Sequence, residues 1–287
     1  MDRPVFSEMP DGKFSRVSAT FSIALLALLF CAPSIWAQDS TDFDAYKVRL
    51  SGFWFYSNPS GHFDASNGTD SIDLQKDVGF NSYSTFSGKI DWKFTRKNHL
   101  YFVGSSFDQT RVVTLNRTIT FQGQTFVAGL SVKANLSAPL YAPGYQYDLF
   151  RRKRWHLGLA VQMNLFDASA SIDAAAQVTG GGVHQAAVSA KGSLLAPIPV
   201  AGPQVRVYLT NSPRLYVDGS VFGMYLFGYG NFLSTNDFLG VTLAKHLSAN
   251  AGYQLGSRLV VNNSNSNNRI GLHLTQSGPI AGLQASF

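Results

Sequence analysis

One short motif in this 287-residue chain could supply a base and a nucleophile. His246-Leu247-Ser248 places an imidazole two residues from a hydroxyl, and a histidine that takes the proton of a serine activates the serine for attack. Such a pair also needs a third group that orients the histidine, and no glutamate follows it in the chain. We therefore interpret these residues as a polar turn and predict no catalytic residue.

Other site chemistry finds little support in the sequence. There is no glycine-rich phosphate loop, no nucleotide signature and no cysteine or histidine spacing typical of a metal site, so we predict no cofactor and no metal. A net charge of +6 and a pI of about 9.4 could indicate nucleic-acid binding. The basic residues are spread over turns and alternating positions and do not form one face, so we predict no nucleic-acid partner.

A second group of ionisable residues is defined by its place in alternating segments. Each member is expected on a polar face whose opposite face is apolar. If these residues face the interior of a barrel, their charges could pair with one another and fill it. Alternatively, they could line a narrow pore, which would mildly prefer anions because basic members outnumber acidic ones. The group comprises Arg49, Lys89, Asp91, Lys93, Asp148, His156, Arg206, Asp218, Arg258 and His273.

The segments that position these residues have the pattern of membrane-spanning strands. In residues 86–96, Ile90 and Trp92 share one face, while Lys89 and Asp91 take the other. A soluble two-layer core does not need large apolar residues backed directly by charges. A barrel in lipid does, because its outside is apolar and its interior is wet.

The spacing of turns predicts how many strands there are. Four tight turns are expected near residues 97, 152, 212 and 247. Longer polar connections are expected at 58–82, 111–129 (hairpin-like around Gly123), 167–192, 228–236 and 262–268. With one strand before the first hairpin and one after the last, this predicts an all-β, transmembrane, antiparallel up-and-down barrel of about ten strands, with eight or twelve as alternatives. The short turns are expected in the periplasm and the long loops outside the cell.

Three prolines stand eight residues before the ends of predicted strands: Pro143, Pro203 and Pro279. Around Pro279 the apolar positions change phase, from even-numbered Leu274 to odd-numbered Leu283. Proline cannot donate to the ladder of a sheet, and a bulge shifts the phase of a strand by one residue. We therefore predict bulges or kinks at all three prolines.

The last segment alternates apolar Ala281, Leu283, Ala285 and Phe287 with polar or small residues. A terminal phenylalanine on such a strand resembles the C-terminal signature of Gram-negative outer-membrane β-barrels, and the wider pattern is similar to the OmpA-transmembrane and OmpW-like barrels. The resemblance implies that Phe287 is an assembly signal read by the barrel-assembly machinery. It also implies an environment of outer-membrane lipid, and we expect a monomer.

The first 37 residues predict a secretory signal peptide, with an uncleaved helical anchor as the alternative. Lys13 and Arg16 precede a short apolar stretch that ends at Ala37 and is followed by polar residues. Cleavage after Ala37 would remove the only cysteine and leave residues 38–287 as one barrel domain without disulfides. The expected location is the outer membrane.

Two enzyme families provide alternatives by resemblance. The His-x-Ser motif resembles that of the lipid A deacylases, which act at the outer leaflet, whereas we place it on a periplasmic turn. The omptin proteases are ten-stranded barrels whose site pairs aspartates with an Asp-x-His at the outer rim, and this chain lacks that spacing. The residues expected near the rim are Asp70, Asp73, Asp108, Asp167, Asp173, His62 and His184.

The sequence therefore predicts a non-enzymatic integral outer-membrane barrel, either structural or a narrow passive pore for small solutes. One alternative is a surface-exposed binding protein or adhesin that acts through its extracellular loops. The other is an outer-membrane hydrolase such as a lipid A deacylase.

Overall fold

A computed structural model describes most of the predicted barrel domain. The described residues are 43–64, 71–121, 123–174, 177–179, 182–185, 187–211, 214–226, 230–262 and 271–287. The predicted signal peptide lies outside them, as do Asp70 and nearly all of the connection at 262–268.

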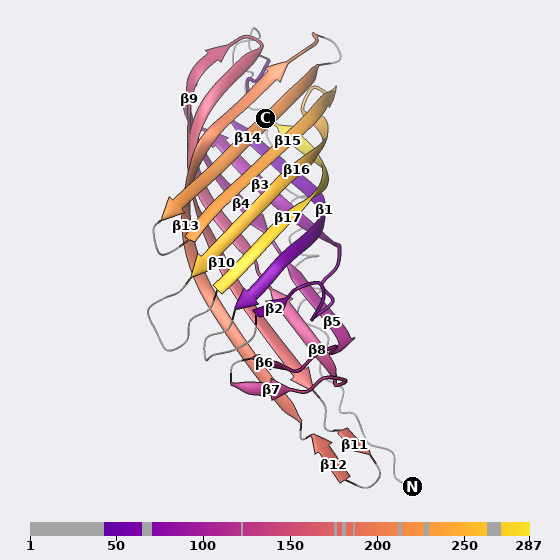
Figure 1. Ribbon diagram of the computed structural model, residues 1–287. Coiled ribbons are helices and arrows are strands. Elements are labelled where there is room, and N and C mark those ends of the chain that lie inside the picture. The colour runs from indigo at the N-terminus through magenta and orange to yellow at the C-terminus, as the bar shows by residue number, and fades with distance from the viewer. Residues whose placement is uncertain are drawn as a thin grey trace.

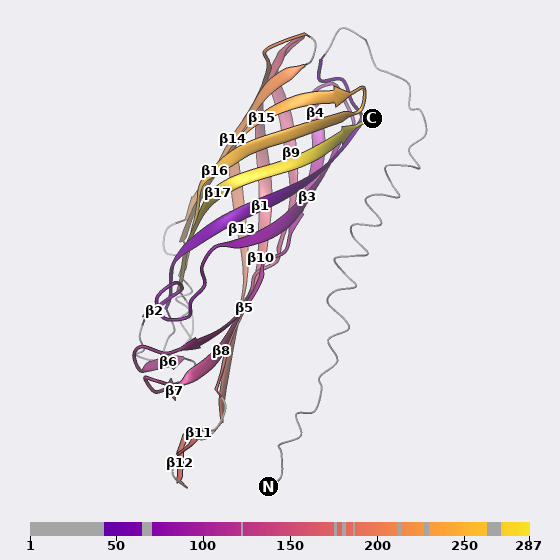
Figure 2. The ribbon, with the colours of Figure 1, turned by 90° about the vertical axis from the view of Figure 1, so that its right-hand side faces the viewer.

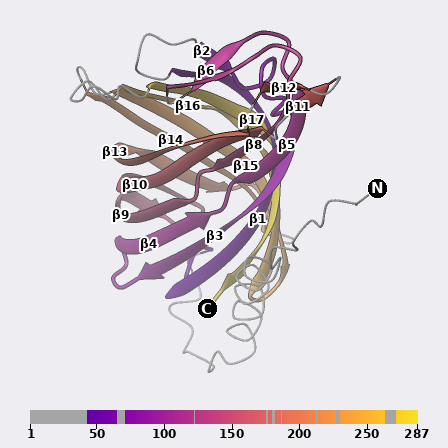
Figure 3. The same ribbon diagram turned by 90° about the horizontal axis from the view of Figure 1, so that it is seen from below.

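Ten strands form one closed antiparallel ring, which confirms the predicted fold class and strand number (Figures 1 and 3). Pairing of β10 with β13 and of β17 with β1 closes the ring. Around the ring, the strands are β1 (Val48–Asp64), β3 (Tyr83–Lys93), β4 (Asn98–Ser105), β9 (Leu140–Arg152), β10 (Trp155–Ala174), β13 (Val188–Tyr208), β14 (Leu215–Leu226), β15 (Gly230–Ala244), β16 (Leu247–Asn262) and β17 (Gly271–Ser286). No helix that could cross a membrane is found among the described residues.

The short connections lie at one end of the ring, the turn end, which is uppermost in Figure 1. They join β3 to β4, β9 to β10, β13 to β14 and β15 to β16, as predicted. At the same end, the backbone N–H of Phe287 donates to the carbonyl of Val48 at 2.8 Å, and the N–H of Val48 donates back at 3.1 Å. Phe287 therefore completes the pairing between the last strand and the first.

The outer face of the ring is apolar and the inner face is polar. Phe86 and Trp92 on β3 are 69% and 52% exposed, whereas Asp91 and Lys93 on the same strand are buried. Side chains of a strand alternate between its two faces, so apolar residues that are exposed here cover the outside of the barrel. The predicted faces are confirmed for residues 86–93, whereas residues 94–96 belong to the turn and not to the strand.

The predicted bulges at Pro143 and Pro203 are wrong, since the register runs unbroken past both prolines. At Pro279 the register against β1 is unbroken, whereas the register against β16 shifts between Gln254 and Ser257, opposite residues 276–278, because β16 carries an extra residue there. One proline removes one ladder donor but leaves the pairing on either side intact. The apolar phase changes for another reason. Leu274 packs into the interior apolar clusters, whereas Leu283, 56% exposed, faces outward. Register shifts within the ring lie in three strand pairs: β9–β10, β15–β16 and β16–β17.

Several predicted loops are wrong, because strands continue through them (Figure 2). β1 runs to Asp64, β10 to Ala174, and β15 begins at Gly230. Small and polar side chains leave no hydropathy alternation in these segments, yet β10 stays paired with β13 as far as Ala174 and Val188. The predicted hairpin around Gly123 is confirmed, and Gly123 has the positive φ of 76° that a tight turn favours.

Short strands lie at the end opposite the turns. β2 (Ser71–Asp73), β5 (Asp108–Thr114) and β8 (Ser131–Ser137) extend the main sheet. β6 (Ile119–Phe121) with β7 (Gln124–Phe126), and β11 (Gln177–Thr179) with β12 (Gly182–Gln185), form two separate hairpins. Ile119, Phe121 and Phe126 of the hairpin are fully buried, and they pack with Val132 of β8 and Ile172 of β10. The loop end therefore carries a folded apolar cap.

Candidate functional site

Six of the ten residues predicted to face the interior line a cavity of about 310 Å³ inside the ring. Two others, Lys93 and Asp148, are buried toward the turn end. The six that line the cavity are Arg49, Lys89, Asp91, His156, Arg206 and Asp218.

The remaining two, Arg258 and His273, lie outside the cavity. The register of β16 against β17 shifts between Gln254 and Ser257, which reverses the faces of β16 beyond that point and leaves Arg258 exposed. His273 stacks on its pairing partner His62, with ring centroids 4.4 Å apart. The residue after His273 lines the cavity, so His273 is on the opposite face. Both positions correct the sequence-based assignment.

The carboxylate of Asp44 gathers the basic side chains at the turn end of the interior. It forms an ion pair with Arg49. Nζ of Lys93 lies 3.5 Å from its Oδ2, and Nη1 of Arg206 lies 3.2 Å from its Oδ1. Nδ1 of His156 lies 3.3 Å from Oδ2. All five side chains are buried, so the Coulombic attraction is only weakly screened by solvent.

Asp44 is held from five of the ten ring strands. The partners above lie on β1, β3, β10 and β13, and Arg151 of β9 donates to the backbone carbonyl of Asp44 at 2.9 Å. The neighbouring Phe43 packs edge-on against Tyr208, with ring centroids 5.7 Å apart, and the guanidinium of Arg214 lies 4.6 Å from its ring centroid. The segment before β1 therefore crosses the mouth of the barrel at the turn end.

We call residues 43–47 the turn-end seal, and their electrostatics favour an ionised Asp44. Burial by itself raises the pKa of Asp44, because it strips water from the charged form. The positive charges of Arg49, Lys93 and Arg206 outweigh burial and hold the pKa well below its ordinary value. Without this carboxylate, Arg49 and Lys93 would lose their ion-pair partner, which is strongly destabilising for buried cations, while Arg206 would keep Asp218.

His99 links the seal to two further carboxylates. Its Nδ1 lies 3.2 Å from Oδ1 of Asp91, and its Nε2 lies 3.1 Å from Oδ2 of Asp148. The hydroxyl of Tyr46, within the seal, donates to Asp91 at 3.1 Å, and Arg151 pairs with Asp148 at 2.9 Å. With both ring nitrogens protonated, His99 can donate to both carboxylates. One connected network thus joins the seal to β3, β4 and β9 at the turn end.

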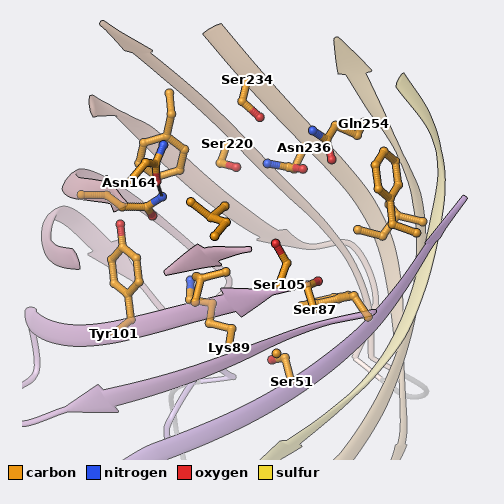
Figure 4. Close-up of a pocket in the computed structure, with 18 of the residues that line it drawn as sticks. Ser51, Ser87, Lys89, Tyr101, Ser105, Asn164, Ser220, Ser234, Asn236 and Gln254 are labelled. Atoms are coloured by element: carbon orange, nitrogen blue, oxygen red, sulfur yellow. Dashed lines mark hydrogen bonds between the residues drawn. The ribbon is translucent and has the colours of Figure 1, made fainter. Parts of the chain in front are cut away.

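The side chains that line the cavity change from charged to polar to apolar with distance from the turn end (Figure 4). Short hydroxyl and amide side chains follow the charged residues of the network. Farther from the turn end lie Phe166, Phe222, Phe232 and Leu274 of the interior apolar cluster. Barrels of about eight strands are just narrow enough for side chains to fill, so short residues in a ring of ten leave space. The hydroxyl and amide residues labelled in Figure 4 are Ser51, Ser87, Ser105, Asn164, Ser220, Ser234, Asn236 and Gln254.

His246 contacts the end of β17 and not Ser248. Nδ1 of His246 lies 2.7 Å from the carbonyl of Ser286, and its ring stacks on Phe287 with centroids 5.6 Å apart. Ser248 is buried on β16, and no hydrogen bond joins it to His246 in the part of the chain that the structure covers. The histidine is therefore committed to the end of β17.

The acidic residues expected near the rim do not converge. Asp73 caps a turn by accepting two backbone N–H groups, and Asp173 accepts from Asn135. Asp108 and Asp167 are exposed. Within the described ranges, no cluster of three His, Cys, Asp or Glu side chains could hold a metal ion. Asp70 lies outside the described residues, as does the side chain of His184.

The sequence patterns do not reveal Asp44, because it precedes the first alternating segment. The sequence does contain one indication of its role. Asp44 follows Phe43 and stands two residues before Tyr46, directly before a strand whose inward positions begin with Arg49. A carboxylate next to two aromatic residues at that point could have indicated a segment that folds into the mouth.

Comparisons with known proteins agree with the fold. No protein-family model matches the chain, and no curated protein matches it. Its structure is similar to that of the outer membrane protease OmpT from Escherichia coli, with a TM-score of 0.56 and 11% identity, over 89% of this chain and 100% of that chain. It also matches the translocator domain of the autotransporter NalP from Neisseria meningitidis, with a TM-score of 0.43 and 9% identity, over 95% of this chain and 96% of that one. The toluene transporter TodX from Pseudomonas putida matches with a TM-score of 0.37 and 7% identity, over 91% and 92%.

The similarity to OmpT concerns the fold alone. The chain therefore has the fold of an outer-membrane β-barrel protein, with ten strands and an apolar outer face. At 11% identity, no activity is carried over from OmpT to this chain.

Proposed function

We propose that this protein is a non-enzymatic barrel of the outer membrane that is sealed at its turn end and has a structural role. The observation that carries the proposal is the position of Asp44, which pairs with Arg49, Lys93 and Arg206 inside the mouth. A solute that crossed the barrel would have to displace this buried network. Breaking a buried ion pair by removing one partner is strongly unfavourable, so the seal opposes passage.

The surroundings and assembly of the barrel are part of the same proposal. Its apolar outer face contacts outer-membrane lipid, and β17 with Phe287 is the segment that the barrel-assembly machinery reads. The closed ring supports a monomer, because a closed sheet has no free edge strand to pair with a second copy.

A narrow pore with a mild preference for anions is the alternative, and it requires the seal to move. An enzymatic role has less support, since neither the His246–Ser248 pair nor the described rim aspartates are arranged for catalysis.

Liposome swelling tests the proposal. Purified protein is refolded into liposomes, which are then diluted into isotonic solutions of small neutral sugars or amino acids. We expect swelling no faster than that of protein-free liposomes. Swelling that is faster and that slows with increasing solute size would overturn the sealed structural role in favour of the pore.

A further inference from the structure

The hydroxyl of Tyr101 is a buried polar group that lacks a hydrogen-bond partner among the described residues. Tyr101 is 5% exposed and lines the cavity (Figure 4). Its ring lies against Gly144 on β9, where the absence of a side chain leaves room for it, since an added Cβ would lie 2.3 Å from Cζ of Tyr101. Leaving a buried hydroxyl unpaired is unfavourable. The hydroxyl is therefore fixed in position and available to an occupant of the cavity.

Lys89 adds a positive charge over the ring of the same tyrosine. Its Nζ lies 4.5 Å from the ring centroid of Tyr101, and no salt bridge to Lys89 occurs in the part of the chain described. The neighbouring carboxylates are committed elsewhere, Asp91 to His99 and Asp218 to Arg206.

Among the described side chains, the interior carries more positive than negative charge. Five cations face four anions there, so within this set at least one positive charge has no counterpart even if the histidines are neutral. In a confined interior such a charge favours an anion. The cations are Arg49, Lys89, Lys93, Arg151 and Arg206, and the anions are Asp44, Asp91, Asp148 and Asp218.

The rest of the cavity suits an apolar body. Phe166, Phe222, Phe232 and Leu274 line it and belong to a buried apolar cluster. Its volume of about 310 Å³ is at the lower end of the range for small-molecule sites, roughly 300–1,000 Å³. An occupant that removes water from this wall would be stabilised by the hydrophobic effect.

From these features we infer that the cavity binds a small amphipathic monoanion, a carboxylate carried on an apolar body. The carboxylate accepts hydrogen bonds from Nζ of Lys89 and the hydroxyl of Tyr101. Ser51 and Ser105 provide further hydroxyls near the head group, and the apolar body lies against Phe222 and Phe232. This inference goes beyond the proposed structural role, which does not require a ligand.

Three probes that share a phenyl ring on a four-carbon chain and carry an anionic, a neutral or a cationic head group test the inference: 4-phenylbutyrate, 4-phenylbutanol and 4-phenylbutylamine. Equilibrium dialysis against the refolded full barrel, with empty micelles subtracted, gives each affinity at neutral pH. We expect the acid to bind about tenfold more tightly than the alcohol, since hydrogen bonds to charged groups are the stronger ones. The amine is expected to bind most weakly. No binding of any probe, or equal binding of all three, would overturn the inference and indicate a cavity filled by water alone.

Matched variants locate the site. Lys89→Met should abolish the preference for the acid, whereas Lys133→Met, at an exposed position of β8, should retain it.

Tyr101→Phe should weaken binding of the acid several-fold without lowering the thermal stability of the empty barrel, because its hydroxyl has no partner to lose. Tyr141→Phe, on the exposed face of β9, is its control. Retention of the acid preference in Lys89→Met would contradict the site. If Lys89→Met does not fold, the inference is still tested by the affinity of Tyr101→Phe for the acid and by the ranking of the three probe affinities in wild type.

Discussion

Oδ1 of Asp44 lies 3.2 Å from Nη1 of Arg206, although 162 residues separate them in the chain. Arg206 also donates from Nε to Asp218 at 2.9 Å, so one guanidinium joins the segment before β1 to β13 and β14. Asp44 also contacts His156 of β10, so it reaches both strands of the pair that closes the ring.

Replacement of His99 should be costly, because it lies between Asp91 and Asp148 and is 1% exposed. His99→Ala leaves two buried carboxylates without their shared partner, and we expect the free energy of unfolding to fall by roughly 3–5 kcal/mol. Urea unfolding of the refolded barrel measures this. The exposed His246→Ala should stay within about 0.5 kcal/mol of wild type. Equal unfolding midpoints for the two variants would contradict the network.

The seal should resist mild acid. The pKa of Asp44 is lowered in the folded protein, so its stabilising contribution is complete above the unfolded value, about pH 4, and is lost as the pH falls through the lower folded value. Liposome swelling measured from pH 7 downward should therefore stay at the protein-free rate to about pH 4. Onset of swelling between pH 7 and 5 would show that a different group controls the mouth.

The apolar cap should unfold separately from the ring. Phe126 is fully buried in it, and Phe126→Ala should destabilise the cap by about 3–5 kcal/mol. We expect faster protease cleavage within residues 115–130, while the ring keeps its heat-modifiable migration on gels. Val127→Ala, at a neighbouring position that is 46% exposed, is the control. If Phe126→Ala abolished the heat-modifiable form, the cap would instead be required for the ring.

The faces of the strands could be predicted because a strand has a fixed side-chain period of two. Lys89, Ile90 and Asp91 illustrate this, since the outer position is exposed and both inner positions line the cavity. Arg258 could not be placed, because the register shift between Gln254 and Ser257 leaves no mark in hydropathy. The length of β10 could not be predicted for a related reason, since its Ala- and Ser-rich end lacks an apolar alternation although it pairs with β13 as far as Ala174.

The function-related residues were harder to predict than the fold. Lys89 was assigned to the interior, but its relation to Tyr101 depends on pairing between β3, β4 and β9 and on the missing side chain of Gly144. Asp44 belongs to no strand, and its partners come from five. Contacts of that kind follow from closure of the ring, which no local pattern encodes.

In our proposal, Asp44 holds residues 43–47 across the mouth of the barrel. Conductance in planar bilayers tests this directly. Asp44→Ala is compared with wild type, and Asp108→Asn, a change at an exposed aspartate, is the control. Heat-modifiable migration on gels first establishes that each variant has folded. We expect no steady channel events for wild type and the control, and frequent or sustained opening for Asp44→Ala. Open channels in wild type, or a folded Asp44→Ala that remains silent over the same voltages, would contradict the account.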